Sequence, residues 1–292
     1  GRILSTPSHG RNVGRYHSVT RVSKNFGIAD CHKPSSSCKL IQIMLQRFCR
    51  HPLRFTVKLI RLFAALIGAR LDAAQLGIRK KQLTLPQKNQ WQSKWSKRIL
   101  RAMDIQVTHH GSPPTNGMLV SNHLSYLDIM AISTALPATF LSKAEVRKWP
   151  LIGPLTEFAG TLFVKRERKS DLQALTEAFS AVWQKGSMIV MFPEGTSSNG
   201  DTVLPFKSSL LKPACDEEQL VTPAFVSYKC EEGSLKEDVY FWRDMAFAPH
   251  LMRLLSVKSI HAHVTFGQSQ LPQKQDRKSL TRSLWEEVKE MH

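Results

Sequence analysis

Residues 118–128 read Met-Leu-Val-Ser-Asn-His-Leu-Ser-Tyr-Leu-Asp, an apolar run followed by two residues that can exchange protons, His123 and Asp128. The run Met118–Val120 predicts a buried strand, and ligands of α/β domains commonly bind just beyond such strand ends. In one regular helix, side chains five residues apart point about 140° away from each other, so the pair could not share a helix face. For the two side chains to pair, His123 must lie in the loop and Asp128 in the first helical turn. Ser125 favours this arrangement as N-cap of a Ser125-x-x-Asp128 capping box.

A histidine beside a carboxylate is a common general base. The Asp128 carboxylate can hold one imidazole nitrogen of His123 while the other nitrogen takes a proton from a substrate. The simpler alternative is that Asp128 only caps a helix and that His123 is a polar loop residue. The motif alone leaves both interpretations open, so the rest of the chain has to separate them.

Short apolar runs alternate with helical patterns from about residue 105 onward. This alternation predicts an α/β fold with a mixed, mostly parallel sheet flanked by helices, in one domain over residues 105–292. The expected strands are Met118–Val120, Thr139–Leu141, Thr161–Val164, Met188–Phe192, Val221–Val226 and Ile260–Phe266. The expected helices lie near residues 127–136, 170–185, 207–215 and 277–291. His109 and His110 are expected in a loop before the first strand.

Three further segments begin or end on a predicted strand, so they can meet His123 at one edge of the sheet. They are Gly160-Thr-Leu-Phe-Val-Lys-Arg166, Phe192-Pro-Glu-Gly-Thr-Ser-Ser198 and Val221-Thr-Pro-Ala-Phe225. In this order, with the His-x4-Asp motif, they resemble the four sequence blocks of the lysophospholipid (1-acylglycerol-3-phosphate) acyltransferase family, the PlsC-like enzymes. Further matches are Lys143, Trp149-Pro150, Gly153 and Phe206-Lys207, and the resemblance spans about residues 115–228.

The resemblance implies an O-acyltransferase and a role for each motif. His123, oriented by Asp128, would take the proton of an acceptor hydroxyl as that hydroxyl attacks the thioester of acyl-CoA or acyl-carrier protein. The donor is a co-substrate, and no cofactor or metal is expected. The residues expected around the acceptor and its phosphate are Lys165, Arg166, Glu194, Gly195, Thr196, Ser197 and Lys207, with Asn122, Gly160 and Pro223 in supporting places. No Gly-x-Ser-x-Gly elbow is present, which agrees with a mechanism without a covalent acyl-enzyme.

The third block departs from the family pattern at Ser197, where the family usually has arginine. The change removes a bidentate ligand for phosphate. Either Arg166 and Lys207 suffice to bind 1-acylglycerol-3-phosphate, whose acylation gives phosphatidic acid, or the acceptor carries no phosphate. The form Glu194-Gly-Thr-Ser-Ser-Asn-Gly200 is similar to that of acyltransferases that complete ornithine lipids. Lyso-ornithine lipid is therefore the alternative acceptor.

The net positive charge lies in the first third of the chain. Residues 1–110 hold 21 basic and three acidic residues, a net of +18, which equals the charge of the whole chain. We expect a disordered basic leader over residues 1–38 and basic amphipathic helices over residues 39–104, broken at Pro52, that dock on an anionic membrane. The part after residue 79, with Trp91 and Trp95, is expected to be a surface helix.

No stretch of the sequence is apolar over the length that a membrane span requires. The longest uncharged apolar run, Leu62–Ala69, is far shorter than the roughly 20 residues needed. We therefore expect a peripheral or interfacially embedded protein on the cytoplasmic face of a membrane. Five irregularly spaced cysteines predict no disulfide framework.

Two other classes of function remain open on the sequence. A basic leader also suits a nucleic-acid-binding protein without catalysis, although no RNA-recognition, zinc-finger or helix-turn-helix signature is present. A catalytically silent lipid-binding protein of the same fold is the other class. His261 and His263 share one face of a predicted strand, a spacing that can bind metal, but a half-exposed strand explains it more simply. Candidates for either an acyl pocket or core packing are Trp242, Met245, Phe247 and Leu251.

Overall fold

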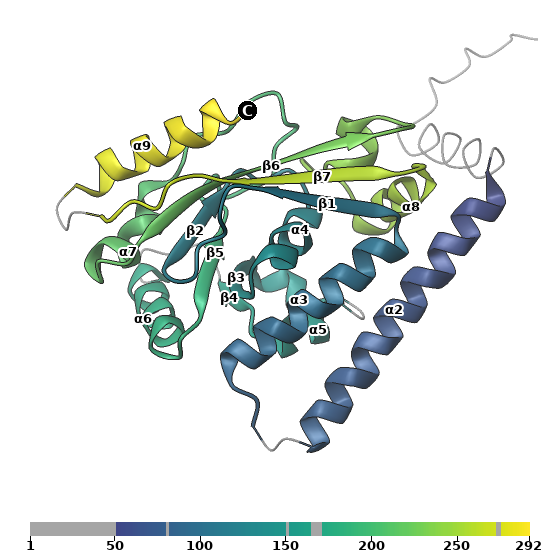
Figure 1. Ribbon diagram of the computed structural model, residues 1–292, viewed down its shortest axis with the longest axis horizontal. Helices are drawn as coiled ribbons and strands as arrows, with labels where there is room; N and C mark the ends of the chain where they lie inside the picture. The colour runs from purple at the N-terminus through teal and green to yellow at the C-terminus, as the bar shows by residue number, and fades with distance from the viewer. Residues whose placement is uncertain (1–50, 80–81, 150–151, 165–170, 273–275) are drawn as a thin grey trace, which may run out of the picture. The chain divides into compact units, whose positions relative to one another are not determined.

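The computed structural model describes residues 51–79, 82–149, 152–164, 171–272 and 276–292. A seven-stranded sheet crosses this part of the chain in the order β1-β7-β6-β2-β5-β3-β4 (Figure 1). The strands are β1 (Ile105–His110), β2 (Met118–Ser121), β3 (Ala138–Lys143), β4 (Leu162–Val164), β5 (Met188–Met191), β6 (Val221–Cys230) and β7 (Ile260–Phe266). Neighbouring strands are parallel except for β6 and β7. The expected mixed, mostly parallel sheet is confirmed.

Helices cover both faces of the sheet. On one face lie α2 (Pro52–Arg79), α3 (Leu85–Ala102), α4 (Leu127–Ala135) and α8 (Phe247–Ser256), and on the other α6 (Asp171–Gln184), α7 (Lys212–Asp216) and α9 (Arg277–Glu290). Side chains of β2 alternate between the two cores: Leu119 packs in the first, Met118 and Val120 in the second. All three are fully buried, which is why this strand reads as a continuous apolar run.

Four short elements connect the layers. They are α5 (Ile152–Phe158), the 3₁₀ turns η1 (Ala144–Lys148) and η2 (Ser208–Leu211), and the π turn η3 (Leu235–Val239). Gly153 lets α5 pack closely on η1, because a Cβ there would lie 2.1 Å from the carbonyl oxygen of Arg147. The two elements pack on each other, and η1 also contacts β3.

The helix expected after residue 79 is α3, and it is not a simple surface helix. A capping box between Thr84 and Gln87 starts it. Trp91 and Trp95 are each 7% exposed and pack with Ala69 of α2. One face of α3 is therefore buried: α3 packs on β1 and β3, and α2 packs on α3 at the outside of the molecule (Figure 1).

Basic residues in the first half of α2 contact the rest of the protein, whereas Arg70 is exposed. Lys58 is 1% exposed, and its ammonium group donates to the carbonyl oxygens of Met103, Val257 and Lys258 at 2.8–3.0 Å. Burial lowers the pKa of Lys58. Arg61 pairs with Asp104 at 2.9 Å. These contacts attach α2 to the end of α3 and to the segment before β7.

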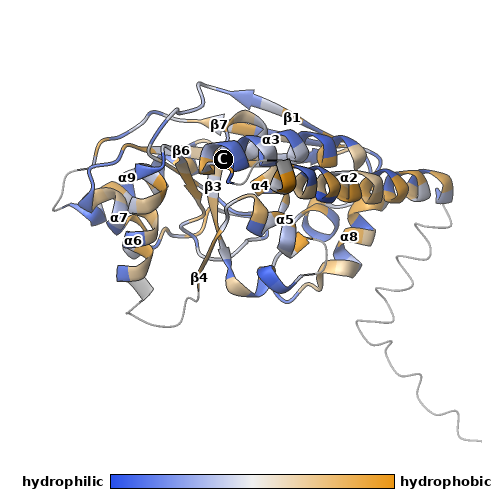
Figure 2. Cartoon of the chain, turned by 90° about the horizontal axis from the view of Figure 1, so that it is seen from below, coloured by the Kyte–Doolittle hydropathy of each residue, from blue (hydrophilic) through white to orange (hydrophobic). Residues whose placement is uncertain are grey.

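Much of the exposed face of α2 is apolar, although Arg61 and Arg70 are exposed as well. Its exposed large hydrophobic residues are Leu53, Val57, Ile60, Phe63, Ile67, Leu71 and Ile78. We call these seven residues the α2 stripe, and Figure 2 shows the apolar character of the helix. Among the described helices, none combines the length and the apolar content that crossing a bilayer requires.

Other expected elements need correction. His109 and His110 lie in β1, which escaped prediction because only Ile105 of that strand is buried. The single helix expected over 207–215 is η2 followed by α7, with Pro213 in the first turn of α7. Helix α8 was not expected because Pro249 interrupts its pattern, but that proline lies in the first turn, where it is tolerated.

The N-terminal part of the chain is described only from residue 51 onward. Pro52 is the first residue of α2, in keeping with its expected place at a helix boundary. The leader over residues 1–38 and the helix expected before Pro52 lie outside the described residues.

Candidate active site

His123 follows β2 and Asp128 lies in the first turn of α4, as the motif predicts. Nδ1 of His123 lies 2.7 Å from Oδ2 of Asp128. The Asp128 side chain is fully buried, whereas that of His123 is 22% exposed. Because Nδ1 faces the carboxylate, Nε2 is the nitrogen left to accept a proton from a substrate.

Backbone groups of the loop hold the same carboxylate oxygen. The N–H groups of Leu124 and Ser125 donate to Oδ2 of Asp128 at 2.7 and 2.9 Å. The expectation that Ser125 is the N-cap is wrong, because α4 begins at Leu127 after Tyr126 and has no side-chain cap. The carboxylate half of the capping box forms nevertheless, and it fixes Asp128 under the loop that carries the histidine.

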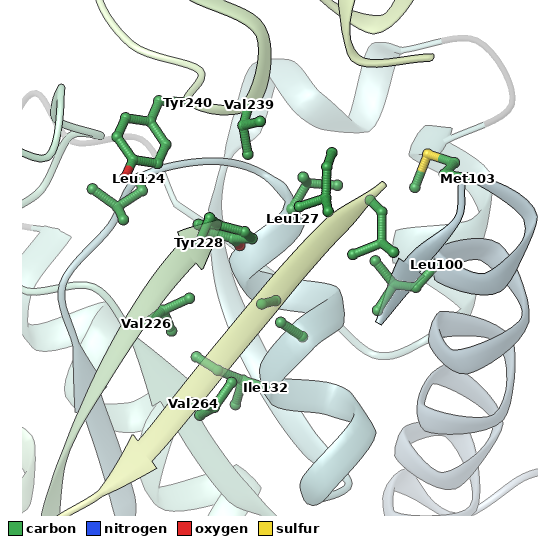
Figure 3. Packing of buried hydrophobic residues seen from close by; sticks show 14 of the residues in the cluster. Leu100, Met103, Leu124, Leu127, Ile132, Val226, Tyr228, Val239, Tyr240 and Val264 are labelled. Atoms are coloured by element: carbon green, nitrogen blue, oxygen red, sulfur yellow. The ribbon is translucent and has the colours of Figure 1, made fainter. Parts of the chain in front are cut away.

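Tyr228 contacts the other oxygen of the Asp128 carboxylate. The sequence analysis did not identify this tyrosine as part of the site. Its hydroxyl donates to Oδ1 of Asp128 at 2.5 Å. Figure 3 shows the ring extending from β6 toward Leu127 at the start of α4. Burial and the neighbouring Asp128 raise the pKa of Tyr228 well above its usual value, so the phenol keeps its proton and remains a donor.

A signal for Tyr228 does exist in the sequence. Ala224, Val226 and Tyr228 alternate along β6 and share the core that contains α4. A tyrosine on a fully buried strand face needs an acceptor for its hydroxyl. The nearest acidic residue on that side of the sheet is Asp128, but only the order of the strands, with β6 beside β2, reveals this.

His123 borders a large apolar cavity. Its ring stacks on that of Phe192, with the centroids 4.1 Å apart and 13° between the planes. The cavity has a volume of about 910 Å³, within the range of small-molecule sites. Its walls come from several helices and include Leu62, Phe63 and Leu66 of α2, Trp91 and Trp95 of α3, Ile129 and Met130 of α4, and Phe247 and Leu251 of α8. Of the four pocket candidates, Phe247 and Leu251 line this cavity, whereas Trp242 and Met245 do not.

The segment after β5 lies against the histidine loop. The backbone N–H of His123 donates to Oε1 of Glu194 at 3.2 Å, and that of Ser198 donates to the carbonyl oxygen of His123 at 2.8 Å. Glu194 is 3% exposed, and this burial raises its pKa to about 8. The carboxyl group is therefore mostly protonated at neutral pH.

The ammonium group of Lys207 lies beside Gly195 of the same segment. The φ of Gly195 is +76°, and a Cβ at this position would lie 2.4 Å from Nζ of Lys207. The positive φ favours glycine at this position, and the ammonium group of Lys207 lies close to the Cα of Gly195. Lys207 is thus placed beside the segment, while Gly195 and the exposed Thr196 line the cavity.

Two polar side chains fix the backbone around the histidine. Asn122 donates to the carbonyl oxygen of Val226 at 2.9 Å and accepts from its N–H at 2.7 Å, which ties the end of β2 to β6. The hydroxyl of Ser197 donates to the carbonyl oxygen of Phe241. Ser197 therefore positions the segment before α8 rather than replacing the charge of an arginine.

The remaining candidates lie farther from the histidine or outside the described residues. Gly160, with φ +85°, ends α5 and touches Leu85 of α3, where a Cβ would lie 2.5 Å from its side chain. Pro223 lies within β6 level with Val120, next to the first residue of the pairing with β7. Lys165 and Arg166 lie outside the described residues, so their expected contact with phosphate stays a prediction.

The described residues hold no cluster of three or more His, Cys, Asp or Glu side chains that could bind a metal ion. Nδ1 of His263 instead lies 2.6 Å from the hydroxyl of Thr108 on β1. His261 and His263 lie on the partly exposed face of β7, because they alternate with buried residues along the strand.

Comparison with known proteins finds a matching family model and similar curated proteins. A family model described as "Acyltransferase" matches residues 104–227. The lyso-ornithine lipid O-acyltransferase of Pseudomonas aeruginosa is 34% identical over 196 residues, which cover 67% of this chain and 75% of that protein. The 1-acyl-sn-glycerol-3-phosphate acyltransferase of Neisseria meningitidis serogroup B is 33% identical over 171 residues, 58% of this chain and 67% of that protein.

A solved structure shares the fold. The crystal structure of the 1-acyl-sn-glycerophosphate (LPA) acyltransferase PlsC from Thermotoga maritima matches with a TM-score of 0.61 at 20% sequence identity. The match covers 84% of this chain and 95% of that one, so it includes helices outside the segment matched by the family model.

Proposed function

The chain belongs to the acyltransferase family, and from this premise we propose that it transfers a fatty acyl group from a thioester donor to the free hydroxyl of a lysolipid. The observation that carries the proposal is the 2.7 Å contact between His123 and the buried Asp128 at the border of a large apolar cavity. The contact orients a proton acceptor, and the cavity offers space for an acyl chain beside it.

The proposed reaction proceeds in one transfer between two bound substrates. Nε2 of His123 accepts the proton of the acceptor hydroxyl while the hydroxyl oxygen attacks the carbonyl carbon of the thioester. The carbon–sulfur bond breaks as the tetrahedral intermediate collapses, and the imidazolium returns its proton to the departing thiolate. Asp128 stabilises the imidazolium between these steps. A positioned base of this kind contributes about 10²–10⁴ in rate.

The acceptor head group has two candidates. The first is 1-acylglycerol-3-phosphate, for which Lys207 beside Gly195 and the predicted ligand Arg166 supply positive charge. The second is lyso-ornithine lipid, which the serine at position 197 favours because the arginine expected there is absent and the serine hydroxyl is engaged with Phe241. The similar protein of Pseudomonas aeruginosa is a lyso-ornithine lipid O-acyltransferase, which supports the second candidate.

A donor-release assay tests the proposal. Free thiol is followed with acyl-CoA or acyl-carrier protein as donor, and with lysophosphatidate, lyso-ornithine lipid or no acceptor in neutral detergent micelles. We expect thiol release that requires a lysolipid and that matches the amount of diacylated product. Release at the same rate without any acceptor would show a thioesterase and contradict the proposal.

We further propose that the protein works at a membrane surface, on its cytoplasmic face. The α2 stripe presents apolar side chains to solvent, as an interfacial helix does. Phe63 belongs to the stripe and also lines the cavity. An acyl chain could therefore pass from the leaflet to His123 along α2 without crossing water.

A further inference from the structure

Arg243 lies on the segment between η3 and α8 and lines the same cavity as His123. Its side chain is exposed, and its guanidinium carbon lies 3.9 Å from the ring centroid of Trp242. Its φ is +56°, a left-handed conformation that residues other than glycine rarely adopt. Such a conformation persists where surrounding contacts impose it, and it is frequent at ligand-binding sites.

Three contacts impose the conformation of this segment. The indole N–H of Trp242 donates to the carbonyl oxygen of Lys236 at 3.0 Å, which fixes the ring beneath the guanidinium. The backbone N–H of Phe241 donates to the carbonyl oxygen of Leu124, in the loop that carries His123, at 2.8 Å. The hydroxyl of Ser197 holds the carbonyl oxygen of the same Phe241.

These contacts link Arg243 to the histidine loop and to the third sequence block. Leu124 follows His123 directly, and Ser197 is the position at which the family usually has arginine. The serine that removes one positive charge thus helps to fix the segment that supplies another.

The guanidinium of Arg243 has no carboxylate partner among the described residues. Other arginines that lie near the sheet do form such pairs, for example Arg61 with Asp104 and Arg253 with Glu237. Stacking on Trp242 leaves the N–H groups at the edge of the guanidinium available for a planar anion. Lys143 is the other cation that lines the cavity among the described residues, and it offers a point charge rather than a fork.

The geometry points to Arg243, supported by Trp242, as the subsite that binds the anionic head group of the acceptor, a phosphate or a carboxylate. This inference rests on the proposed function and names the residue that selects the acceptor. The anion would lie at the rim of the cavity, with the acyl chain of the lysolipid inside it and its free hydroxyl near His123. Arg243 would thereby replace the ligand that is absent at position 197.

Arg243→Gln tests the inference, because it should change KM for anionic acceptors but not KM for an uncharged acceptor. Initial rates are measured in neutral detergent micelles with lysophosphatidate, lyso-ornithine lipid and the uncharged 1-acylglycerol as acceptors. Loss of a charge-assisted, two-pronged contact should raise KM for the preferred anionic acceptor about tenfold or more. KM for 1-acylglycerol and for the acyl donor should not change, and kcat should change little. Arg243→Lys should give an intermediate KM, because it keeps the charge but loses the fork.

Two control variants make the result specific. Arg98→Gln removes another exposed arginine stacked on a tryptophan, with its guanidinium carbon 4.7 Å from the centroid of Trp95, but Arg98 does not line the cavity. It should leave all KM values unchanged. Arg243→Gly accepts the positive φ without strain and should raise the acceptor KM as Arg243→Gln does. If glycine restored the wild-type KM, the effect of glutamine would come from the backbone, and the inference would be overturned.

Other outcomes separate this inference from the proposed function. An unchanged acceptor KM in Arg243→Gln would overturn the inference while wild-type acyl transfer still supported the function. A raised KM for acyl-CoA alone would place the guanidinium at the donor phosphates and overturn it as well. If the wild-type protein acylated none of the three acceptors, the proposed function would fail, and this inference would fail with it.

Discussion

The phenolic oxygen of Tyr228 lies 2.5 Å from Oδ1 of Asp128, although the two residues are 100 positions apart in the chain. The other carboxylate oxygen accepts from His123, Leu124 and Ser125, so donors surround both oxygens of a fully buried group. A buried carboxylate without such donors would be strongly destabilised. The orientation of His123 therefore depends on β6 as well as on its own loop.

Tyr228→Phe should weaken this arrangement without emptying the core. The hydrogen bond to a charged group that it removes is worth about 1.5–3 kcal/mol, so we expect kcat/KM to fall about tenfold. The carboxylate also becomes a stronger base when it loses a donor, and it then holds the imidazolium more strongly. The acid limb of the pH dependence of kcat/KM should move to higher pH. A full pH–rate profile with acyl-CoA and a lysolipid measures both effects.

Tyr240→Phe is the matched control for this prediction. The Tyr240 ring centroid lies 6.2 Å from that of Tyr228, in the same buried cluster (Figure 3). Unlike Tyr228, Tyr240 makes no hydrogen bond to the carboxylate of Asp128 in the described part of the chain. Tyr240→Phe should keep the wild-type pH profile. Equal profiles for all three proteins would show that Tyr228 has a packing role only.

Glu194 should make the stability of the protein depend on pH. Burial raises its pKa from 4.5 to about 8, so the folded state holds this proton where the unfolded state releases it. The associated stability is fully present below about pH 4.5 and is lost as the pH rises through about 8, by about 1.4 kcal/mol for each unit of pKa difference. Glu194→Gln removes the titration. Urea unfolding from pH 5 to pH 8.5 should show wild type losing stability relative to the variant, and parallel curves would contradict the prediction.

The α2 stripe should carry much of the affinity for membranes. Ile60 and Ile67 are 62% and 53% exposed, and neither lines the cavity. Replacing both with serine removes apolar surface worth about 1 kcal/mol or more at each position, so vesicle binding should fall at least tenfold. Leu271→Ser is the control, since Leu271 is 66% exposed but lies outside the stripe. Sedimentation with anionic vesicles measures binding, and equal losses for both variants would argue against a membrane-facing α2.

Sequence patterns predicted the sheet and the centre of the site because both follow local rules. The fully buried run Met118–Val120 predicted a central strand, and the spacing of His123 and Asp128 required the loop-to-helix geometry that the structure shows. The expected class of enzyme followed from the order of four motifs, and membership of the family now excludes the reading as a protein without catalysis that binds nucleic acid.

Local sequence patterns could not predict contacts between segments that are distant in the chain. The sequence pattern predicts Lys58 as a charged residue of an amphipathic helix. The side chain is nevertheless buried, because its ammonium group donates to three carbonyl groups from two other segments. Tyr228 and Arg243 become parts of the site only through the order of the strands and the packing of the segment before α8. A single sequence shows the periodicity of each helix or strand, but it does not show which carbonyl or carboxylate group from another segment a side chain will contact.

His123 acts as the base in the proposed reaction, and thiol release by His123→Ala tests this role. The variant is compared with wild type and with His261→Ala, which removes a histidine from the sheet face of β7, at saturating acyl-CoA and lysolipid. Thermal unfolding of each protein establishes that the fold is kept. We predict that release by His123→Ala falls by about 10²–10⁴ while His261→Ala stays at the wild-type rate. A folded His123→Ala protein with close to wild-type acyl transfer would contradict the account.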